Sequence, residues 1–557
     1  MRVPRQTGSQ LFAAMVRGYG LQAVFFVPTI LYPALAAMEG WGIRRVMTHG
    51  EKAAAYMADG YARAARRPGI AMAQMVGAAN LAAGLKDAFL YGAPVIAITG
   101  GPDPQHRHRG VYQEADDRAL FGPLTKWQAR VDRVDRLPDL LRQAFRVAVS
   151  GIPGPVHLEL RGHMGQVLEE EADLDLVIEE AFATYPPFRP VAEPERLRAA
   201  LAALHRAERP VLVADAGVIV SDAGPEVVAL AERLRIPVAT SLDAKEIIPA
   251  THPLAIGVAG TYSRWCANRL LREADLVFFI GSTTASQVTA HWQCPPLGTR
   301  TIQLHIAPEE IGRNYAAPLG LCGDPKATLQ ALLALADEGP PRTSWLSRAE
   351  QVVAEWRAEQ APRRQSDARP MRPERLCWEL SAWLPPDAVL VSDTGHAGIW
   401  TGTMVDLQHP TQRYLRAAGS LGWALPAALG VKCALPDRPV VCFTGDGGLY
   451  YHLAELETAV RYGLAVVVVV NNNRALSQEI WSINEAYGGD HAGRGAEMWM
   501  FEEIDLARVA ERLGCLGLRV EHPAEVRPAL DAALAAGRPA VVDVVTDVAA
   551  VADRVRW

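Results

Sequence analysis

The sequence predicts an α/β protein with three consecutive domains, each built on a doubly wound parallel sheet. The chain has 557 residues, which is longer than the size at which a single hydrophobic core stops growing. Short apolar runs alternate with helical patterns in three successive series, as in parallel sheets wrapped by helices. Polar and proline-rich stretches separate the series and indicate linkers.

The first series predicts a domain over 1–165. Its apolar runs AVFFV, GIAMAQMV and PVIAITGG are separated by the helical patterns EKAAAYMADGYARAA and NLAAGLKDAFLYG. Buried parallel strands typically have such continuous apolar runs. An acidic and then proline-rich stretch predicts a linker over 166–190.

The second series, with RPVLVADAGV, ADLVFFIGS and TRTIQLHI, predicts a central α/β domain over 191–335. A charged stretch rich in proline and arginine predicts a second linker over 336–372. The third series, with AVLVSDTG, RPVVCFTGDGG, LAVVVVVNNN and PAVVDVVTD, predicts a C-terminal domain over 373–557 that resembles the first.

Composition excludes several classes of partner. The net charge of -6, with no basic stripe or polybasic segment, excludes nucleic acid and membrane surfaces as expected partners. The seven cysteines form no CxxC or Cys/His cluster, which argues against disulfides and zinc. Without a signal peptide or a long uncharged apolar segment, we expect a cytoplasmic protein that binds small molecules.

Polar clusters follow two predicted strands of the third series. Gly445-Asp446-Gly447-Gly448 follows PVVCFT, and Asn471-Asn472-Asn473 follows the next apolar run. Carboxyl ends of parallel strands meet at one rim of the sheet, where ligands bind. Carboxylate, amide and carbonyl oxygens suit Mg2+, and glycines let backbone N–H groups approach phosphates. Taken singly, each cluster also fits an ordinary turn or loop.

Together these clusters resemble the cofactor-anchoring motif of the thiamine-diphosphate (ThDP) dependent decarboxylase and acetolactate synthase superfamily, in which GDG precedes a helix, a strand and NN. The resemblance implies that Asp446, Asn473 and the carbonyl of Ala475 bind Mg2+. The third asparagine leaves the register open by one, so Asn472 is the rival ligand. Asn473 is preferred because Leu476 then falls at a hydrophobic position of the family.

In the first series, THGEKAAAYMADGYARA is similar to the family segment whose glutamate activates the cofactor. The resemblance implies that Glu51 is catalytic and shares a proton with N1′ of the aminopyrimidine ring. The alternative is that Glu51 is a first-turn carboxylate that complements a helix dipole.

Two further segments resemble cofactor-contacting parts of the family. In GSLGWALPAALG, Leu421 stands where an apolar side chain props the cofactor into its bent form. In VSDTGHAGIW, Gly395 and His396 stand near the diphosphate. Leu421 is otherwise explained as a core leucine.

The resemblance covers the chain in the order pyrimidine-binding, central and pyrophosphate-binding domain. It implies a homodimer or homotetramer in which Glu51 of one subunit meets the cofactor of another. The central stretch FFIGSTTASQ lacks the arginine found in flavin-binding synthases, so we expect no FAD.

The family's cofactor chemistry predicts a lyase or transferase that decarboxylates a 2-oxo acid through an enamine or carbanion intermediate. Gln113, in GVYQEADDRALFGPLTKW, resembles a substrate-facing glutamine of the synthase branch; it is otherwise a loop residue. Glu479, six positions after Asn473, stands where simple decarboxylases carry a proton-handling glutamate; it is otherwise an exposed helix residue.

The leading hypothesis is an acetolactate synthase-like carboligase that passes the intermediate to an aldehyde or 2-oxo acid acceptor. The alternatives are a decarboxylase that releases an aldehyde and a degenerate ThDP-binding regulatory protein. An NAD-linked dehydrogenase ranks last because no GxGxxG follows a predicted strand.

Overall fold

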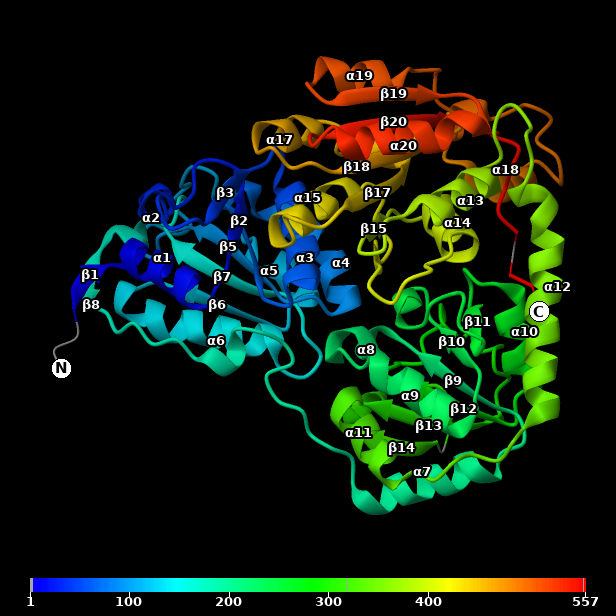
Figure 1. Cartoon of the computed structure of the whole chain (residues 1–557). Coiled ribbons are helices and arrows are strands. Elements are labelled where there is room, and N and C mark those ends of the chain that lie inside the picture. Colours follow the sequence, from blue (N-terminus) through cyan, green and yellow to red (C-terminus); the bar gives the residue numbers. More distant parts are fainter. Residues whose placement is uncertain (1–3, 317, 554, 557) are drawn as a thin grey trace.

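The computed structural model describes residues 4–316, 318–553 and 555–556, which form three α/β domains in chain order (Figure 1). Each domain contains a six-stranded sheet with parallel pairing throughout. The predicted fold class is therefore confirmed. All seven cysteines are free, and within the described residues no helix combines the length and apolar character needed to cross a membrane.

The N-terminal sheet has the strand order β3 (Arg44–Met47), β2 (Ala23–Phe26), β4 (Gly69–Ala73), β5 (Val95–Gly101), β7 (Val156–Arg161), β6 (Trp127–Val131). Its helices are α1 (Gly8–Gly18), α2 (Tyr32–Ala37), α3 (Glu51–Ala65), α4 (Ala78–Tyr91), α5 (Arg118–Phe121) and α6 (Leu137–Val149). Part of the predicted linker over 166–190 packs back onto this domain, because β8 (Glu171–Asp173) pairs antiparallel with β1 (Arg5–Thr7).

The central sheet has the order β11 (Ala255–Val258), β10 (Val238–Thr240), β9 (Pro210–Ala214), β12 (Leu276–Ile280), β13 (Arg300–His305), β14 (Leu319–Cys322). Its helices are α7 (Pro194–Arg206), α8 (Ala216–Ser221), α9 (Gly224–Leu234), α10 (Trp265–Glu273) and α11 (Pro325–Leu335).

The second predicted linker, 336–372, is largely a helix. α12 (Thr343–Arg364) has 22 residues and runs along one edge of the molecule beside the central and C-terminal domains (Figure 1). Its buried residues recur at helical spacing, which the sequence analysis overlooked beneath the charged residues between them: Trp345, Ala349, Val352 and Trp356. This stretch is therefore a structured connection and not a flexible one.

The C-terminal sheet has the order β16 (Arg413–Arg416), β15 (Val389–Ser392), β17 (Val440–Gly445), β18 (Val467–Asn472), β20 (Ala540–Val545), β19 (Leu516–Val520). Numbered within its own domain, this is the order 2-1-3-4-6-5, which the N-terminal sheet also has. The predicted likeness of the two outer domains is thus confirmed in their topology.

The helices of this domain are α13 (Pro373–Trp383), α14 (His396–Met404), α15 (Ala424–Ala434), α16 (Asp446–Tyr450), α17 (Glu455–Arg461), α18 (Ile480–Ala486), α19 (Leu506–Arg512) and α20 (Val526–Ala535). The single helix expected between GDG and the asparagine run is interrupted. Turns over 451–454 divide it into α16 and α17.

Helices α3 and α15 join the two outer domains within the chain (Figure 1). A Cβ atom on Gly60 would overlap the carbonyl oxygen of Ala427, and one on Gly430 would overlap that of Met57. Glycine at both positions therefore allows the backbones to approach closely. This contact fixes the helix that begins with Glu51 against the domain that carries the GDG motif.

A buried histidine makes the N-terminal domain sensitive to acid. His157 Nε2 lies 2.8 Å from Thr99 Oγ1, and its ring stacks on Phe121. Burial lowers the pKa of His157 to about 3. Below the unfolded pKa of about 6.5, the unfolded chain binds a proton that the folded chain excludes, so stability is lost as pH falls.

We expect His157→Gln to reduce this loss of stability. At about pH 4.5, two pH units below the unfolded pKa, the histidine contributes a loss of about 2.7 kcal/mol. Urea denaturation followed by circular dichroism, at about pH 7 and about pH 4.5, should show a smaller fall in unfolding free energy for the variant. An equal fall in both proteins would contradict this assignment.

Candidate active site

A cavity of about 320 Å³ lies at the carboxyl ends of the C-terminal strands. Ten of the eleven residues predicted to bind the cofactor line it: Gly395, His396, Leu421, Gly445, Asp446, Gly447, Gly448, Asn473, Ala475 and Leu476. Glu479 lines it as well. These predicted residues come from segments that are up to 84 positions apart in the sequence (395 to 479).

Strand register explains why the GDG and asparagine segments meet. β17 pairs in parallel with β18, and Gly445 at the end of β17 lies opposite Asn471. Asp446, one residue further, and Asn473, just beyond β18, therefore lie at one rim of the sheet, as the sequence predicted.

Asp446 is a buried carboxylate with an unsatisfied oxygen. Its side chain is buried, and its Oδ2 has no hydrogen-bond partner among the described residues. Burial raises the pKa of Asp446 to about 7, although the backbone N–H groups of Gly447, Ala475 and Arg474 favour the ionised form. A buried carboxylate oxygen without a partner is costly unless a cation or a proton satisfies it.

The side chains of the consecutive asparagines point in different directions. Asn473 lines the cavity and donates from Nδ2 to Ser477 Oγ at 2.8 Å, which leaves its Oδ1 for a cation. Asn472 instead donates to Asp543 Oδ1 at 2.8 Å, away from the cavity. The geometry favours Asn473 over its rival. Asn471, which the sequence analysis did not single out, also lines the cavity, and its buried Oδ1 has no partner in the described part of the chain.

Ser477 was also missed, and it connects the asparagine run to the start of α14. Its Oγ accepts from Asn473 and lies 2.7 Å from His396 Nδ1. The tautomer of His396 decides which of these two groups donates the hydrogen. Burial lowers the pKa of His396 to about 4, so the ring is neutral near pH 7. In the sequence, Ser477 could have been recognised only as a hydroxyl residue four positions after an asparagine at a strand end.

Glycines let the backbone pack closely against the side chains beside these groups. A Cβ on Gly447 would lie 2.6 Å from Leu476 Cδ2, and one on Gly448 would lie 2.6 Å from Thr444 Oγ1. Gly395 has φ of +65°, a conformation that other residues rarely adopt. The unpartnered carboxylate, the amide oxygens and this glycine backbone fit Mg2+ bound between the protein and a diphosphate.

Asp393 fixes the loop that carries Leu421. Its carboxylate accepts from the backbone N–H of Gly422 at 3.1 Å and from Thr444 Oγ1 at 3.0 Å. Burial raises the pKa of Asp393 to about 6. Leu421 is half-buried on the cavity wall, so the loop presents this apolar side chain to the ligand space.

Glu51 and Gln113 lie elsewhere. Glu51 begins α3, and its Oε2 accepts from Asn80 Nδ2 at 3.2 Å. Gln113, in the loop before α5, has φ of +66°, and its buried Oε1 lacks a partner within the described residues. Neither is among the described residues that line the cavity of the same chain. One chain therefore does not bring all predicted site residues together.

The central domain supplies part of the cavity wall, through two residues that the sequence analysis did not single out. Tyr262 and Gln287 line the cavity, and Gln478 Nε2 donates to Tyr262 Oη at 3.3 Å. Together with Arg416 and Ala418, these two residues also line a larger cavity of about 1060 Å³ between the three domains. The candidate site therefore borders a larger chamber between the domains.

The chain matches models of a known protein family. Three family models match in order: thiamine pyrophosphate enzyme, N-terminal TPP binding domain, over residues 6–120; central domain, over 197–332; and C-terminal TPP binding domain, over 393–544. Thiamine pyrophosphate (TPP) is another name for ThDP. The matched ranges contain Glu51, Gln113, Asp446 and Asn473.

Curated relatives align along nearly the whole chain. A probable acetolactate synthase large subunit of Methanocaldococcus jannaschii is 31% identical, over 97% of this chain and 92% of its own length. The large subunit of acetolactate synthase isozyme 3 of Escherichia coli is 29% identical, over 95% and 92%. The acetolactate synthase large subunit of Corynebacterium glutamicum is 30% identical, over 97% and 86%.

Proposed function

This chain belongs to the thiamine pyrophosphate enzymes, in the acetolactate synthase-like branch, and we propose that it is a Mg2+-dependent carboligase. It decarboxylates a 2-oxo acid and joins the remaining fragment to a carbonyl acceptor, which is an aldehyde or a second 2-oxo acid. The observation that carries the proposal is the buried, unsatisfied Asp446 carboxylate oxygen in the glycine-lined cavity.

The residues of the cavity divide by the part of the cofactor they would hold. Asp446, Asn473 and the carbonyl of Ala475 would bind Mg2+, and Leu421 and Leu476 would support the organic rings. Phosphate oxygens would accept hydrogen bonds from N–H groups of the glycine-rich backbone and of the N-terminus of α14: Gly395, His396, Gly445, Gly447 and Gly448. Bound ThDP supplies a nucleophilic carbon and an electron sink for the loss of CO2.

Glu51 would hold the proton at N1′ of the aminopyrimidine. Since Glu51 and Gln113 do not line the cavity of their own chain, the proposal places them at the site of a second subunit. The active unit is then a homodimer, or a homotetramer built from two such dimers, with its sites at the subunit interface.

The test is a product assay. Purified protein with ThDP and Mg2+ is incubated with a panel of 2-oxo acids, with and without an aldehyde, while CO2 is measured and products are identified. We expect hydroxy ketones that disappear when ThDP is omitted. CO2 release without any condensed product would contradict carboligation, and the absence of any ThDP-dependent product would contradict the proposal as a whole.

Glu479 supports a second candidate, a decarboxylase that releases an aldehyde. Its position on the cavity wall, in the turn Ser477–Glu479 before α18, would let a carboxyl group protonate the product-forming carbon. We expect Glu479→Gln to slow aldehyde release by about 100-fold if this reaction dominates. In a carboligase the same change should alter condensation by less than about threefold. The ratio of aldehyde to hydroxy ketone, measured by gas chromatography, distinguishes the two.

A further inference from the structure

The two ends of α14 have different surroundings. Its first residue, His396, and the preceding Gly395 line the candidate site. At the other end, Lys245 of the central domain donates from Nζ to three backbone carbonyls: Thr401 at 2.6 Å, Gly402 at 2.7 Å and Val405 at 2.5 Å. Burial lowers the pKa of Lys245 well below its usual range, and the nearby Asp406 carboxylate opposes that shift. Three acceptors match the three hydrogens of an ammonium group.

Two arginines complete this arrangement. Arg264 Nε donates to the carbonyl of Thr403 at 2.9 Å, and Arg364 Nη2, at the end of α12, donates to that of Met404 at 3.0 Å. Asp406 pairs with both guanidinium groups, at 2.5 and 3.1 Å. The five carbonyls from 401 to 405 thus bind three buried cations, Lys245, Arg264 and Arg364, none of which belongs to the C-terminal domain.

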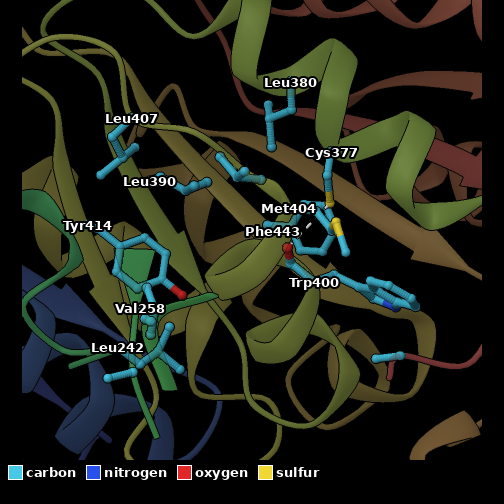
Figure 2. Packing of buried hydrophobic residues seen from close by; sticks show 14 of the residues in the cluster. Leu242, Val258, Cys377, Leu380, Leu390, Trp400, Met404, Leu407, Tyr414 and Phe443 are labelled. Atoms are coloured by element: carbon cyan, nitrogen blue, oxygen red, sulfur yellow. Dashed lines mark hydrogen bonds between the residues drawn. The ribbon is translucent and has the colours of Figure 1, made fainter. Parts of the chain in front are cut away.

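Apolar packing holds the same helix against the central domain. Figure 2 shows Trp400 and Met404 of α14 in one cluster with Leu242 and Val258 of the central domain. A Cβ on Gly402 would lie 2.5 Å from Leu242 Cδ1, so the helix and this segment are in close contact. Leu242 precedes Lys245 by three residues, and one segment of the central domain therefore provides both the apolar and the charged contact.

We propose that Lys245 is a positioning residue for the diphosphate end of the cofactor and acts through α14. The inference rests on the proposed function, because it assumes that ThDP binds at the start of this helix. Cations at a helix C-terminus complement the negative end of the dipole, and they hold the helix along its axis. That position sets where the Gly395 backbone and His396 meet a phosphate.

The inference predicts a selective defect. Asp446 and Asn473 directly follow β17 and β18 and are not part of α14, so a displaced α14 should weaken contacts to the diphosphate and spare the Mg2+ ligands. ThDP affinity should fall, whereas turnover at saturating ThDP should remain. A change in overall stability alone would not produce this pattern.

The experiment compares Lys245→Met with Arg342→Met. Arg342 is also a buried cation, and it donates to the carbonyls of Ala207, Leu204 and Leu234 within the central domain. This control removes a similar cluster of cation–carbonyl bonds that does not contact α14. ThDP affinity is measured by calorimetry with saturating Mg2+, well below the melting temperature, and kcat is measured at saturating ThDP.

For Lys245→Met we expect ThDP to bind at least about tenfold more weakly, with kcat within about threefold of wild type. Arg342→Met should lower the melting temperature but change ThDP affinity by less than about twofold. Unchanged ThDP affinity in Lys245→Met, or an equal loss in Arg342→Met, would overturn the inference.

If Lys245→Met does not fold, Asp406→Asn provides the same test. It removes the anion shared by Arg264 and Arg364 and keeps the side-chain shape. Its ThDP affinity should also fall, by a smaller factor, and an unchanged affinity would overturn the inference. Failure of wild-type protein to bind ThDP would instead contradict the proposed function, which separates the two.

Discussion

Glu51→Gln is expected to reduce turnover by at least about 100-fold, while ThDP remains bound. Glutamine keeps the size of the side chain and its bond to Asn80, but it cannot exchange a proton with the aminopyrimidine ring. Glu51 contributes nothing to the cavity that would hold the diphosphate in its own chain, so the loss should appear in kcat and not in ThDP affinity. Steady-state kinetics together with calorimetric titration of ThDP measure both.

Glu195→Gln is the matched control. Glu195 is an exposed carboxylate in the first turn of α7, as Glu51 is in the first turn of α3. If Glu51 only complements its helix dipole, both variants should lose roughly 0.3–1 kcal/mol of stability and keep their activity. Retained turnover in Glu51→Gln would contradict the catalytic role.

The sequence was sufficient to predict the three sheets, because buried parallel strands leave continuous apolar runs whatever the tertiary context. It did not reveal α12. The buried tryptophans Trp345 and Trp356 lie among arginines and glutamates, and proline in the same stretch, Pro362, suggested a linker. The buried positions of α12 also include Gln360 and Arg364, so its sequence shows little amphipathic pattern.

The candidate site was also predictable from the sequence only in part. Glycines and polar residues at strand ends identified the GDG and asparagine segments, since their positions follow from strand pairing. Tyr262 and Gln287 could not be found from sequence. Their approach to the cavity depends on how the central domain docks, and the charged contacts to α14 that contribute to this docking involve Lys245 and Arg264, far from the motifs along the chain.

Asp446→Asn is expected to weaken Mg2+-dependent ThDP binding by at least about 100-fold, because Mg2+ is bound by few protein groups and loses its only charged one. Without cofactor at pH 8, the variant should be at least as stable as cofactor-free wild type. Burial raises the pKa of Asp446 to about 7, so above pH 7 its ionised form destabilises the empty fold, and asparagine removes that charge. Calorimetry and thermal unfolding measure the two effects.

Mixing the two inactive variants tests whether the site lies between subunits. If Glu51 of one subunit serves the Asp446 site of the other, a dimer of Glu51→Gln with Asp446→Asn has one site with both defects and one with neither. Random reassociation of equal amounts should then restore about a quarter of wild-type activity. If both residues served one site within a chain, every site would carry one defect and no activity would return. Each variant reassociated with itself is the control, and an inactive mixture whose heterodimers are demonstrated by mass spectrometry would contradict the shared site.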